Sequence, residues 1–384
     1  MDKKSLQYAN NNFSLNLFRT IRKDSKDKNN LFSAISIQAS IAMPYIGAKG
    51  KTAQSIRSAL AWDHLDEGYI QTMFMEFFSR LRKSNKLYDL LVVNRMYIEK
   101  SFGIADSFRQ VSEKCFFAEP VSANFKEESE IERVKINEWV TQQTRNKIQA
   151  LLSSGVLNAD SRMVLINAVY FNAKWASPFM ASDTSMQPFK VRPGLTVNVP
   201  TLKGTNVYNF TNDADLRCSA VELAYKGNDL TMVIILPDED FGLEALLQRL
   251  DVENLDRLLT NVRCERDIFM LSLPKFEVTS AFALKYPLSD LGMAEAFSTS
   301  ANFSGISNEK KGLHMSDVIH KSYLRVDERG TEAATATAAI MIPECEIEST
   351  PLSINHPFLF AVVDRRFSNL LMFWGQIVDP SVIT

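Results

Sequence analysis

The chain has 384 residues, of which 46% are hydrophobic and 10% aromatic, so it can bury a large core and is not a disordered protein. Its formal net charge is only -2 and its lysines and arginines are scattered, which argues against the basic surface of a nucleic-acid-binding protein. No apolar run approaches the roughly 20 residues of a membrane span. We therefore expect neither nucleic acid nor a membrane among its partners.

The N-terminus and the cysteines indicate the compartment. The first residues contain no apolar core of signal-peptide length. Cys115, Cys218, Cys264 and Cys345 form neither a CxxC pair nor a dense disulfide framework, so we expect free thiols, most of them buried. These features predict a cytoplasmic protein, or one secreted without a cleavable signal peptide.

The first third of the chain is predicted to be helical, because apolar residues recur three and four positions apart. Helices are expected at residues 13–21, 35–46 and 69–81, followed by a strand at 90–98. A further helix should begin near Ser129, which forms a capping-box pattern with Glu132.

The apolar stripe of that helix includes Ile136, Trp139 and Val140 and continues through Ile148 to Leu152. We therefore expect one long helix over residues 129–152, lying on a surface of the protein.

The rest of the chain is richer in predicted strands. β-branched or aromatic runs occur at residues 163–171, 230–236, 268–273 and 369–378, and several are apolar on both faces, which is typical of central strands. Helices first and strands later indicate an α+β fold. No repeat, low-complexity linker or shift in composition divides the chain, so we expect a single domain over residues 1–384.

No set of residues predicts an enzyme or a metal site. The four histidines, His64, His314, His320 and His356, are dispersed, and neither a His-Glu-x-x-His nor a Gly-x-Ser-x-Gly motif occurs. A lone histidine such as His320, beside apolar residues, is more often a hydrogen-bonded core residue than a catalyst. We expect no cofactor and no catalytic residue.

Residues 47–52 imitate the end of a phosphate-binding loop, because they contain Gly-Lys-Thr. Tyr45, however, stands where that motif has its first glycine, and the preceding segment has the pattern of a helix rather than a strand. We therefore do not expect a nucleotide site.

Residues 330–339 are ten consecutive positions without a bulky side chain. Alanine-rich tracts are usually short helices or linkers, and that alternative stays open. Threonine, however, favours pleated structure, and the threonines here follow a period of two. One face of such a strand would carry Thr331, Ala333, Thr335, Thr337 and Ala339. The tract could stay in solvent or enter a sheet without steric conflict, which indicates a conformational switch.

Four blocks of sequence, in order along the chain, carry a family resemblance. Residues 137–140 match an Asn-x-Trp-Val helix, and residues 167–179 match the strand that follows it. Residues 328–336 match a hinge of an acidic residue, a basic residue, Gly, Thr, Glu and small residues. Residues 355–360 resemble an Asp-His-Pro-Phe-Leu-Phe signature, with Asn355 in place of Asp. Over essentially its full length the chain resembles the serpins, in particular the intracellular ovalbumin-like branch of this protease-inhibitor family.

The resemblance implies an α+β serpin fold of eight to nine helices and three β-sheets, with about residues 328–352 exposed as a reactive-centre loop. In that family the loop offers a protease a bait peptide bond, and the protease's serine is acylated. The cleaved loop then enters the main sheet as a new strand before hydrolysis is complete, which traps the enzyme. The implied partner is a target endopeptidase in a covalent complex with a monomeric inhibitor.

The small residues fit that mechanism, because overpacking a sheet costs about 1–3 kcal/mol per bad site. The one charge in the tract, Glu332, lies on the opposite face of the expected strand. We therefore favour an inhibitor. A non-inhibitory serpin acting as a carrier or chaperone, and an inhibitor of a cysteine protease, stay open as alternatives.

The family's usual spacing, fourteen residues beyond Gly330, implies a bait bond between Glu344 and Cys345. Glutamate at this position suggests a serine endopeptidase whose primary pocket carries a positive group. Alternative positions for the bond are Met341, Ile342 and Pro343. Of these, the first two would suit an elastase-like or chymotrypsin-like protease.

The resemblance also assigns residues to the control of sheet opening. The hinge comprises Glu328, Gly330, Thr331, Glu332, Ala333, Ala334, Thr335, Ala336 and Thr337. The shutter, a buried polar cluster under the middle of the main sheet, comprises Ser33, Ser36, Asn167 and His320. The breach, at the top of that sheet, comprises Trp175 and Lys275, and we expect an ion pair between Lys275 and Glu328.

Overall fold

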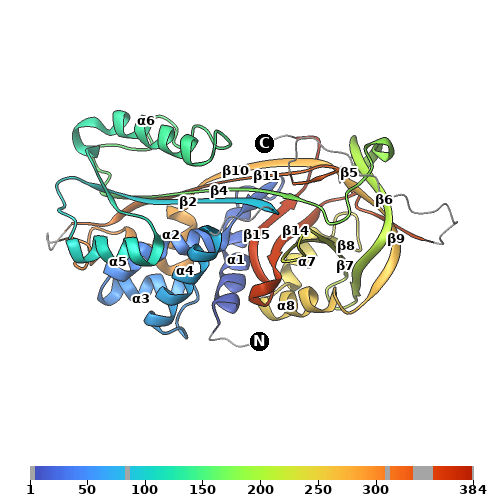
Figure 1. Ribbon diagram of the computed structural model, residues 1–384, viewed down its shortest axis with the longest axis horizontal. Coiled ribbons are helices and arrows are strands. Elements are labelled where there is room, and N and C mark those ends of the chain that lie inside the picture. Colours follow the sequence, from blue (N-terminus) through green and yellow to red (C-terminus); the bar gives the residue numbers. More distant parts are fainter. Residues whose placement is uncertain (1–4, 83–86, 308–311, 332–348, 383–384) are drawn as a thin grey trace.

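The N-terminal third of the chain forms a layer of helices beneath a long β-sheet (Figure 1). The computed structural model describes residues 5–82, 87–307, 312–331 and 349–382. Nine α-helices lie within these residues: α1 (Leu6–Arg22), α2 (Ala34–Gly47), α3 (Gly50–Ala59), α4 (Glu67–Arg82), α5 (Asp106–Phe116), α6 (Phe125–Gln143), α7 (Leu243–Arg249), α8 (Val252–Asn261) and α9 (Lys285–Leu288). The helices predicted at 13–21, 35–46 and 69–81 are confirmed as parts of α1, α2 and α4.

The long helix predicted over residues 129–152 is wrong at its end, whereas its predicted start coincides with a kink in α6, where Glu128 has non-helical φ and ψ angles of -134° and 34°. A first turn precedes this kink, and there Glu99, far away in sequence, accepts hydrogen bonds from the N–H groups of Phe125 and Lys126 at 2.8 and 3.1 Å. This carboxylate caps the first turn, and Ser129 follows the kink inside α6. The prediction that this helix covers a surface is confirmed, since α6 lies on the side of the long sheet opposite α1–α5 (Figure 1).

The end of α6 is set by local backbone geometry. Arg145 and Asn146 have φ angles of 51° and 62°, which a right-handed helix cannot contain. The Thr144 hydroxyl donates to the Val140 carbonyl at 2.8 Å and accepts from the Ile148 N–H at 3.1 Å. Ile148, Leu151 and Leu152 still pack into the apolar cluster beneath α6. The apolar pattern therefore continues after the helix has ended.

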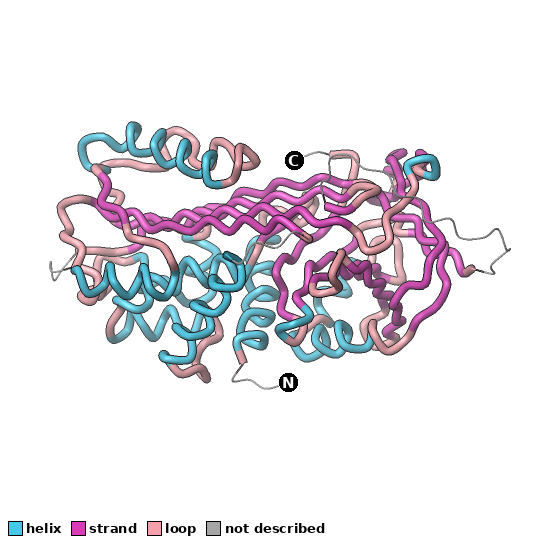
Figure 2. The backbone as a smooth tube through the Cα atoms, in the orientation of Figure 1, coloured by secondary structure: helices cyan, strands magenta, loops and turns pink. Residues whose placement is uncertain are grey.

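The long sheet contains six strands in the described residues: β2 (Tyr88–Glu99), β3 (Val121–Ala123), β4 (Met163–Lys174), β10 (Phe276–Ala283), β11 (Met315–Val326) and β12 (Gly330–Thr331). Its order is β10-β11-β4-β2-β3, with β12 paired to β4. Figure 2 shows its strands running along the length of the molecule, with helices on both sides of them.

A second network of nine strands forms the other part of the fold: β1 (Asn30–Phe32), β5 (Ser185–Arg192), β6 (Leu195–Asp213), β7 (Cys218–Ala224), β8 (Leu230–Pro237), β9 (Arg266–Pro274), β13 (Thr350–Ser353), β14 (Phe358–Asp364) and β15 (Leu370–Ile377). The 19-residue β6 joins the β5, β9 and β13 part of this network to the β7, β8, β14, β15 and β1 part. All five predicted strands are confirmed, within β2, β4, β8 and β9 and at β15. The α+β architecture is confirmed as well.

The central strand β4 is buried on both faces. Leu165, Val169 and Phe171 point into the main core, which the helices and the second sheet network also line. Ile166 and Tyr170 alternate with them and pack into the separate cluster beneath α6. This two-sided burial explains why the sequence of β4 is a nearly continuous apolar run.

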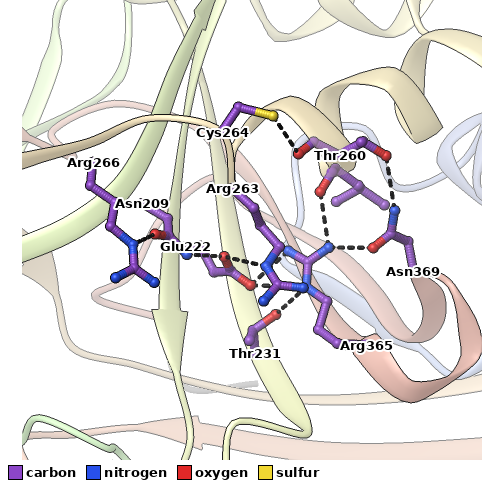
Figure 3. Close-up of polar contacts among 10 residues, drawn as sticks. Asn209, Glu222, Thr231, Thr260, Arg263, Cys264, Arg266, Arg365 and Asn369 are labelled. Atoms are coloured by element: carbon purple, nitrogen blue, oxygen red, sulfur yellow. Dashed lines mark hydrogen bonds and ion pairs between the residues drawn. The ribbon is translucent and has the colours of Figure 1, made fainter.

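A buried ion pair links the second network to the turn after β14. Glu222 of β7 and Arg365, whose side chains are 2% and 4% exposed, approach to 2.7 Å (Figure 3). Arg365 lies in the short 3-10 helix η4 (Arg365–Phe367) and also donates to the Leu259 carbonyl at the end of α8, at 2.9 Å. Burial lowers the pKa of Arg365, and the Glu222 carboxylate opposes this effect. The pair holds β7, α8 and the β14–β15 turn together.

Candidate functional site at the junction of β4, β11 and β12

The first two residues of the predicted insertion tract already belong to the long sheet. Gly330 and Thr331 form β12, which runs antiparallel to β4 opposite Lys174 and Ala173. Gly330 has a φ of 147°, and a Cβ at this position would lie 2.0 Å from the Ala173 carbonyl oxygen. Only glycine fits this close approach without strain. Thr331 is fully buried, and its hydroxyl lies 2.9 Å from the Tyr225 hydroxyl.

Trp175 fixes the turn that leads into β12. Its indole Nε1 donates to the Asp327 carbonyl at 2.9 Å, and its backbone N–H donates to the Arg329 carbonyl at 2.8 Å. Its ring stacks on that of Tyr225, with centroids 4.6 Å apart and planes 10° apart. Burial raises the pKa of Tyr225, so its hydroxyl stays protonated. Trp175 and Tyr225 therefore form one wall behind Thr331.

Lys275 and Glu328 form the expected ion pair, with Lys275 Nζ 2.9 Å from both carboxylate oxygens. The Thr184 hydroxyl donates to the same carboxylate at 2.9 Å. Burial alone would raise the pKa of Glu328, but the hydrogen bonds from Lys275 and Thr184 outweigh it and lower the pKa. The pair anchors Glu328, the first residue of the predicted hinge.

The four predicted shutter residues lie together under the middle of the long sheet. Asn167 of β4 and His320 of β11 are register partners, and the Asn167 side-chain oxygen lies within hydrogen-bonding distance of His320 Nδ1. The Asn167 amide donates to the Ser36 hydroxyl. The Ser33 N–H donates to His320 Nε2 at 3.2 Å, so Nε2 is an acceptor and Nδ1 carries the proton. Burial lowers the pKa of His320 to about 3, which makes the ring neutral at pH 7.

Two residues of this region were missed by sequence reasoning. Asn94 of β2 is the register partner of Asn167 and accepts a hydrogen bond from its amide, so the polar cluster spans three neighbouring strands. Its signal was an amide that, together with Arg95, interrupts a mainly apolar strand pattern. Tyr225, which contacts Thr331, lies between β7 and β8 and carries no comparable signal in the sequence.

Part of the predicted site falls outside the described residues. This applies to the hinge positions Glu332, Ala333, Ala334, Thr335, Ala336 and Thr337 and to the bait-bond positions Met341, Ile342, Pro343, Glu344 and Cys345. Their roles stay predictions. Glu328, Gly330, Thr331, Trp175 and Lys275 are brought together at one end of β4, and the shutter cluster lies further along the same strand.

The segment that imitates a phosphate-binding loop follows α2, so the predicted helical context is confirmed. The Lys49 N–H donates to the Asn302 carbonyl at 2.9 Å, and the Asn302 N–H donates to the buried Thr52 hydroxyl at 2.8 Å. These polar groups serve packing between α3 and a neighbouring loop.

Cys115, Cys218 and Cys264 are free thiols, and the first two are buried, as predicted. Burial raises the pKa of Cys218 to about 12. Cys345 lies outside the described residues. Within the part of the chain that the structure describes, no group of three or more His, Cys, Asp or Glu side chains is arranged to hold a metal ion. Among those residues, none of the helices combines the length and apolar character of a bilayer-spanning helix.

Comparison with known proteins identifies the class. The family model described as "Serpin (serine protease inhibitor)" matches residues 8–380. Leukocyte elastase inhibitor of Bos taurus is 34% identical to this chain over 386 residues, covering 98% of this chain and 100% of that protein. Serpin B4 of Homo sapiens is 32% identical, with the same coverage of both chains.

Comparison with solved structures indicates the same family. Uncleaved ovalbumin superposes with a TM-score of 0.89 at 25% identity, covering 98% of this chain and 100% of that structure. Human thyroxine-binding globulin complexed with its ligand superposes with a TM-score of 0.89 at 27% identity, covering 98% and 99%. The chain belongs to the serpin family. Its similarity includes relatives that are named inhibitors of leukocyte elastase and others that belong to the serpin B group.

Proposed function

We propose that this protein inhibits an endopeptidase by suicide-substrate trapping. The protease's serine hydroxyl attacks the carbonyl of the bait residue, the C–N bond breaks, and the amine of the next residue leaves with a proton. An ester then joins the two proteins. Insertion of residues 330–343 into the long sheet carries the protease away before water can hydrolyse that ester.

One observation carries this proposal: the strand arrangement at the junction. β4 and β11 are parallel neighbours, paired from Met163–Met315 to Tyr170–Tyr323. β12 runs antiparallel to β4 and pairs with it just beyond the end of that ladder. A strand extended from β12 would run antiparallel to both neighbours, and it would replace one parallel pairing by two antiparallel ones. Antiparallel pairing is slightly more stable per residue, and the new strand adds a second ladder.

The register of β12 supports the predicted face of the inserted tract. Continuing it along β4 would bring Thr335 opposite Val169 and Thr337 opposite Asn167, on the side of the main core. The residues between them would face the cluster beneath α6. Side chains directly opposite in an antiparallel pair share a face. The small threonines would therefore be those that enter the tightly packed side.

The residues around the junction take distinct proposed roles. Lys275 and Glu328 would fix the end of the tract that does not move, and Trp175 would hold the turn in which the moving strand begins. Asn167 and His320 would exchange their mutual contact for contacts to the incoming strand. The bait bond would lie between Glu344 and Cys345, with positions 341–343 as alternatives.

The proposal is tested by incubating the protein with elastase-like, chymotrypsin-like, trypsin-like and Glu-specific serine proteases. We expect a covalent complex that survives boiling in detergent with at least one of them. Mass spectrometry of the released C-terminal peptide identifies the bond, and a peptide beginning at Cys345 would assign it to Glu344. A cysteine protease in the same panel tests the alternative target class.

A non-inhibitory relative is the second candidate, because thyroxine-binding globulin, a structural neighbour, is described in complex with thyroxine. Cleavage of the loop by every protease tried, with no covalent product, would favour a non-inhibitory function over inhibition. We further propose that the protein acts as a monomer, in the cytoplasm or after secretion without a cleaved signal peptide. Sedimentation of the purified chain tests the first point, and fractionation of expressing cells tests the second.

A further inference from the structure

Two tyrosines face each other across the boundary between β4 and β11. Tyr170 and Tyr323 are register partners, and their rings stack with centroids 5.8 Å apart and planes 14° apart. Both lie on the face beneath α6, and Tyr170 is only 2% exposed. This geometry is within the range of favourable aromatic pairs. The stack therefore joins the two strands through side chains as well as through the backbone ladder.

The chain that follows α6 touches the same two strands. Lys147 Nζ lies 5.5 Å from the ring centroid of Tyr170, within the distance of a cation–π contact. Two residues later, the Gln149 carbonyl accepts a hydrogen bond from Lys321 of β11 at 2.8 Å. Residues 147–149 thus contact β4 at one side of the boundary and β11 at the other.

We propose that Tyr170, Tyr323 and Lys321, with the residue 147–149 segment, form a seam clasp that sets the rate at which the long sheet opens. This inference rests on the proposed insertion mechanism. A strand placed between β4 and β11 would move them from one strand spacing, about 4.8 Å, to two. The rings of Tyr170 and Tyr323 are then too far apart to stack, and the 147–149 segment can no longer contact both strands. Neither loss is compensated until the new strand is in place.

The seam clasp differs from the polar cluster on the inner face. Asn167 and His320 can find new hydrogen-bond partners in an inserted strand, whereas a ring stack cannot re-form across a third strand. Because the stack is lost on opening and is not regained, the clasp stabilises the closed sheet against both the opening step and the inserted state, and its removal should therefore raise the insertion rate. A residue with this role changes an insertion rate, and a residue that merely packs changes the thermal midpoint alone.

The test measures uptake by the full, uncleaved chain of a synthetic peptide with the sequence of residues 331–343. We expect Tyr323→Ala to take it up roughly two- to tenfold faster than the unmodified protein, from the usual strength of aromatic pairs. Tyr323→Phe keeps the ring and should restore the original rate. Lys321→Met, which removes the bond to Gln149 without touching the core, should also accelerate uptake and serves if the alanine variant does not fold.

Leu91→Ala is the matched control. Leu91 of β2 is the register partner of Tyr170 on its other side and packs against the same cluster beneath α6, but the β2–β4 pair does not part. It should lower the thermal midpoint and leave the uptake rate unchanged. Equal rates for Tyr323→Ala and the unmodified protein, or equal acceleration by Leu91→Ala, would overturn the clasp.

Hydrogen exchange separates this inference from the proposed function. The amides of β4 and β11 should exchange faster in Tyr323→Ala than in Leu91→Ala, whether or not any peptide binds. If no variant takes up the peptide, the insertion mechanism is wrong, and the exchange rates alone decide on the clasp. If all variants take it up at one rate and exchange alike, insertion stands and the clasp is wrong.

Discussion

His320 occupies a position in which a charge is not tolerated. Its ring is fully buried, and its Nε2 accepts a hydrogen bond from the Ser33 N–H. Protonation of Nε2 would break this hydrogen bond and place a charge in the core. Its pKa of about 3 lies far below the value of 6.5 that an exposed histidine has. Between these two pH values the unfolded chain binds a proton that the folded protein does not. The stability that His320 contributes is therefore complete above about pH 6.5 and decreases as the pH falls.

This reasoning predicts a pH-dependent effect of His320→Gln. At pH 7.5 the variant should be less stable than the original protein, because the Ser33 and Asn167 contacts are disturbed. The difference in unfolding free energy should shrink by about 2 kcal/mol between pH 7.5 and pH 5, since glutamine does not titrate. Urea unfolding across this range measures it. A difference that stays constant would show that His320 titrates alike in both states.

Tyr225 and Thr331 allow a double-mutant cycle on the contact that holds β12. Both side chains are fully buried, so removing one hydroxyl leaves the other without its partner and should cost about 1–3 kcal/mol. Tyr225→Phe keeps the stack on Trp175, and Thr331→Val keeps the shape. The double variant should be less destabilised than the sum of the single variants by about 1 kcal/mol, measured by urea unfolding. Strict additivity would mean that the hydroxyls do not interact.

At the scale of elements, helices and strands are predicted best where the residues that determine them are neighbours in the sequence. The strand β4 could be predicted from the sequence because Leu165, Ile166 and Val169 make both of its faces apolar. Such a run is typical of a central strand that is buried on both sides. The first turn and the end of α6 could not be predicted, because Glu99, 26 residues before Phe125, caps that turn, and backbone geometry at Arg145 and Asn146 ends the helix. Periodicity cannot reveal where the backbone turns while apolar residues continue to pack. The same limit applies to the candidate site.

Within that site, the family resemblance located Asn167, Trp175 and Glu328 through the matched blocks, and it assigned Lys275 and the other shutter residues by the positions they take in the family pattern. It could not locate Tyr225 or the Tyr170–Tyr323 stack, because these contacts depend on which strands become neighbours. An aromatic residue in a strand pattern predicts burial, but its partner is fixed only by register.

The ion pair between Glu222 and Arg365 makes a prediction about how the β14–β15 turn is held. Glu222→Ala should destabilise the protein by about 3–5 kcal/mol, because it leaves the Arg365 guanidinium buried without its counter-charge. Arg263→Ala is the control: its side chain is 54% exposed and 3.9 Å from the same carboxylate. Its effect should not exceed about 1 kcal/mol. Thermal unfolding of both variants decides, and similar effects would mean that the buried pair contributes little.

At the scale of the whole molecule, the fold holds an unusual boundary at its centre. The parallel β4–β11 ladder is flanked on both sides by antiparallel pairs, and β12 begins an antiparallel strand at its end. Side chains on both faces of the boundary are already paired, through Asn167 and His320 inside and through the tyrosines outside. A further strand would therefore have to break the contacts that close the sheet. In return, the sheet would gain the backbone hydrogen bonds of two new ladders.

Cleavage of the loop by a protease that is then removed should allow the new strand to insert and should stabilise the fold. A nick within residues 340–346, made by a Glu-specific or elastase-like protease and followed by removal of the enzyme, should raise the thermal midpoint by roughly 10 °C or more. This estimate assumes about ten new ladder hydrogen bonds of about 1 kcal/mol each and the usual unfolding entropy per residue. Thr335→Arg would place a charge on the face that enters the main core, so the nicked variant should gain little, whereas nicked Thr335→Ser should behave like the original protein. Scanning calorimetry before and after cleavage measures both, and an unchanged midpoint in the nicked original chain would rule out insertion.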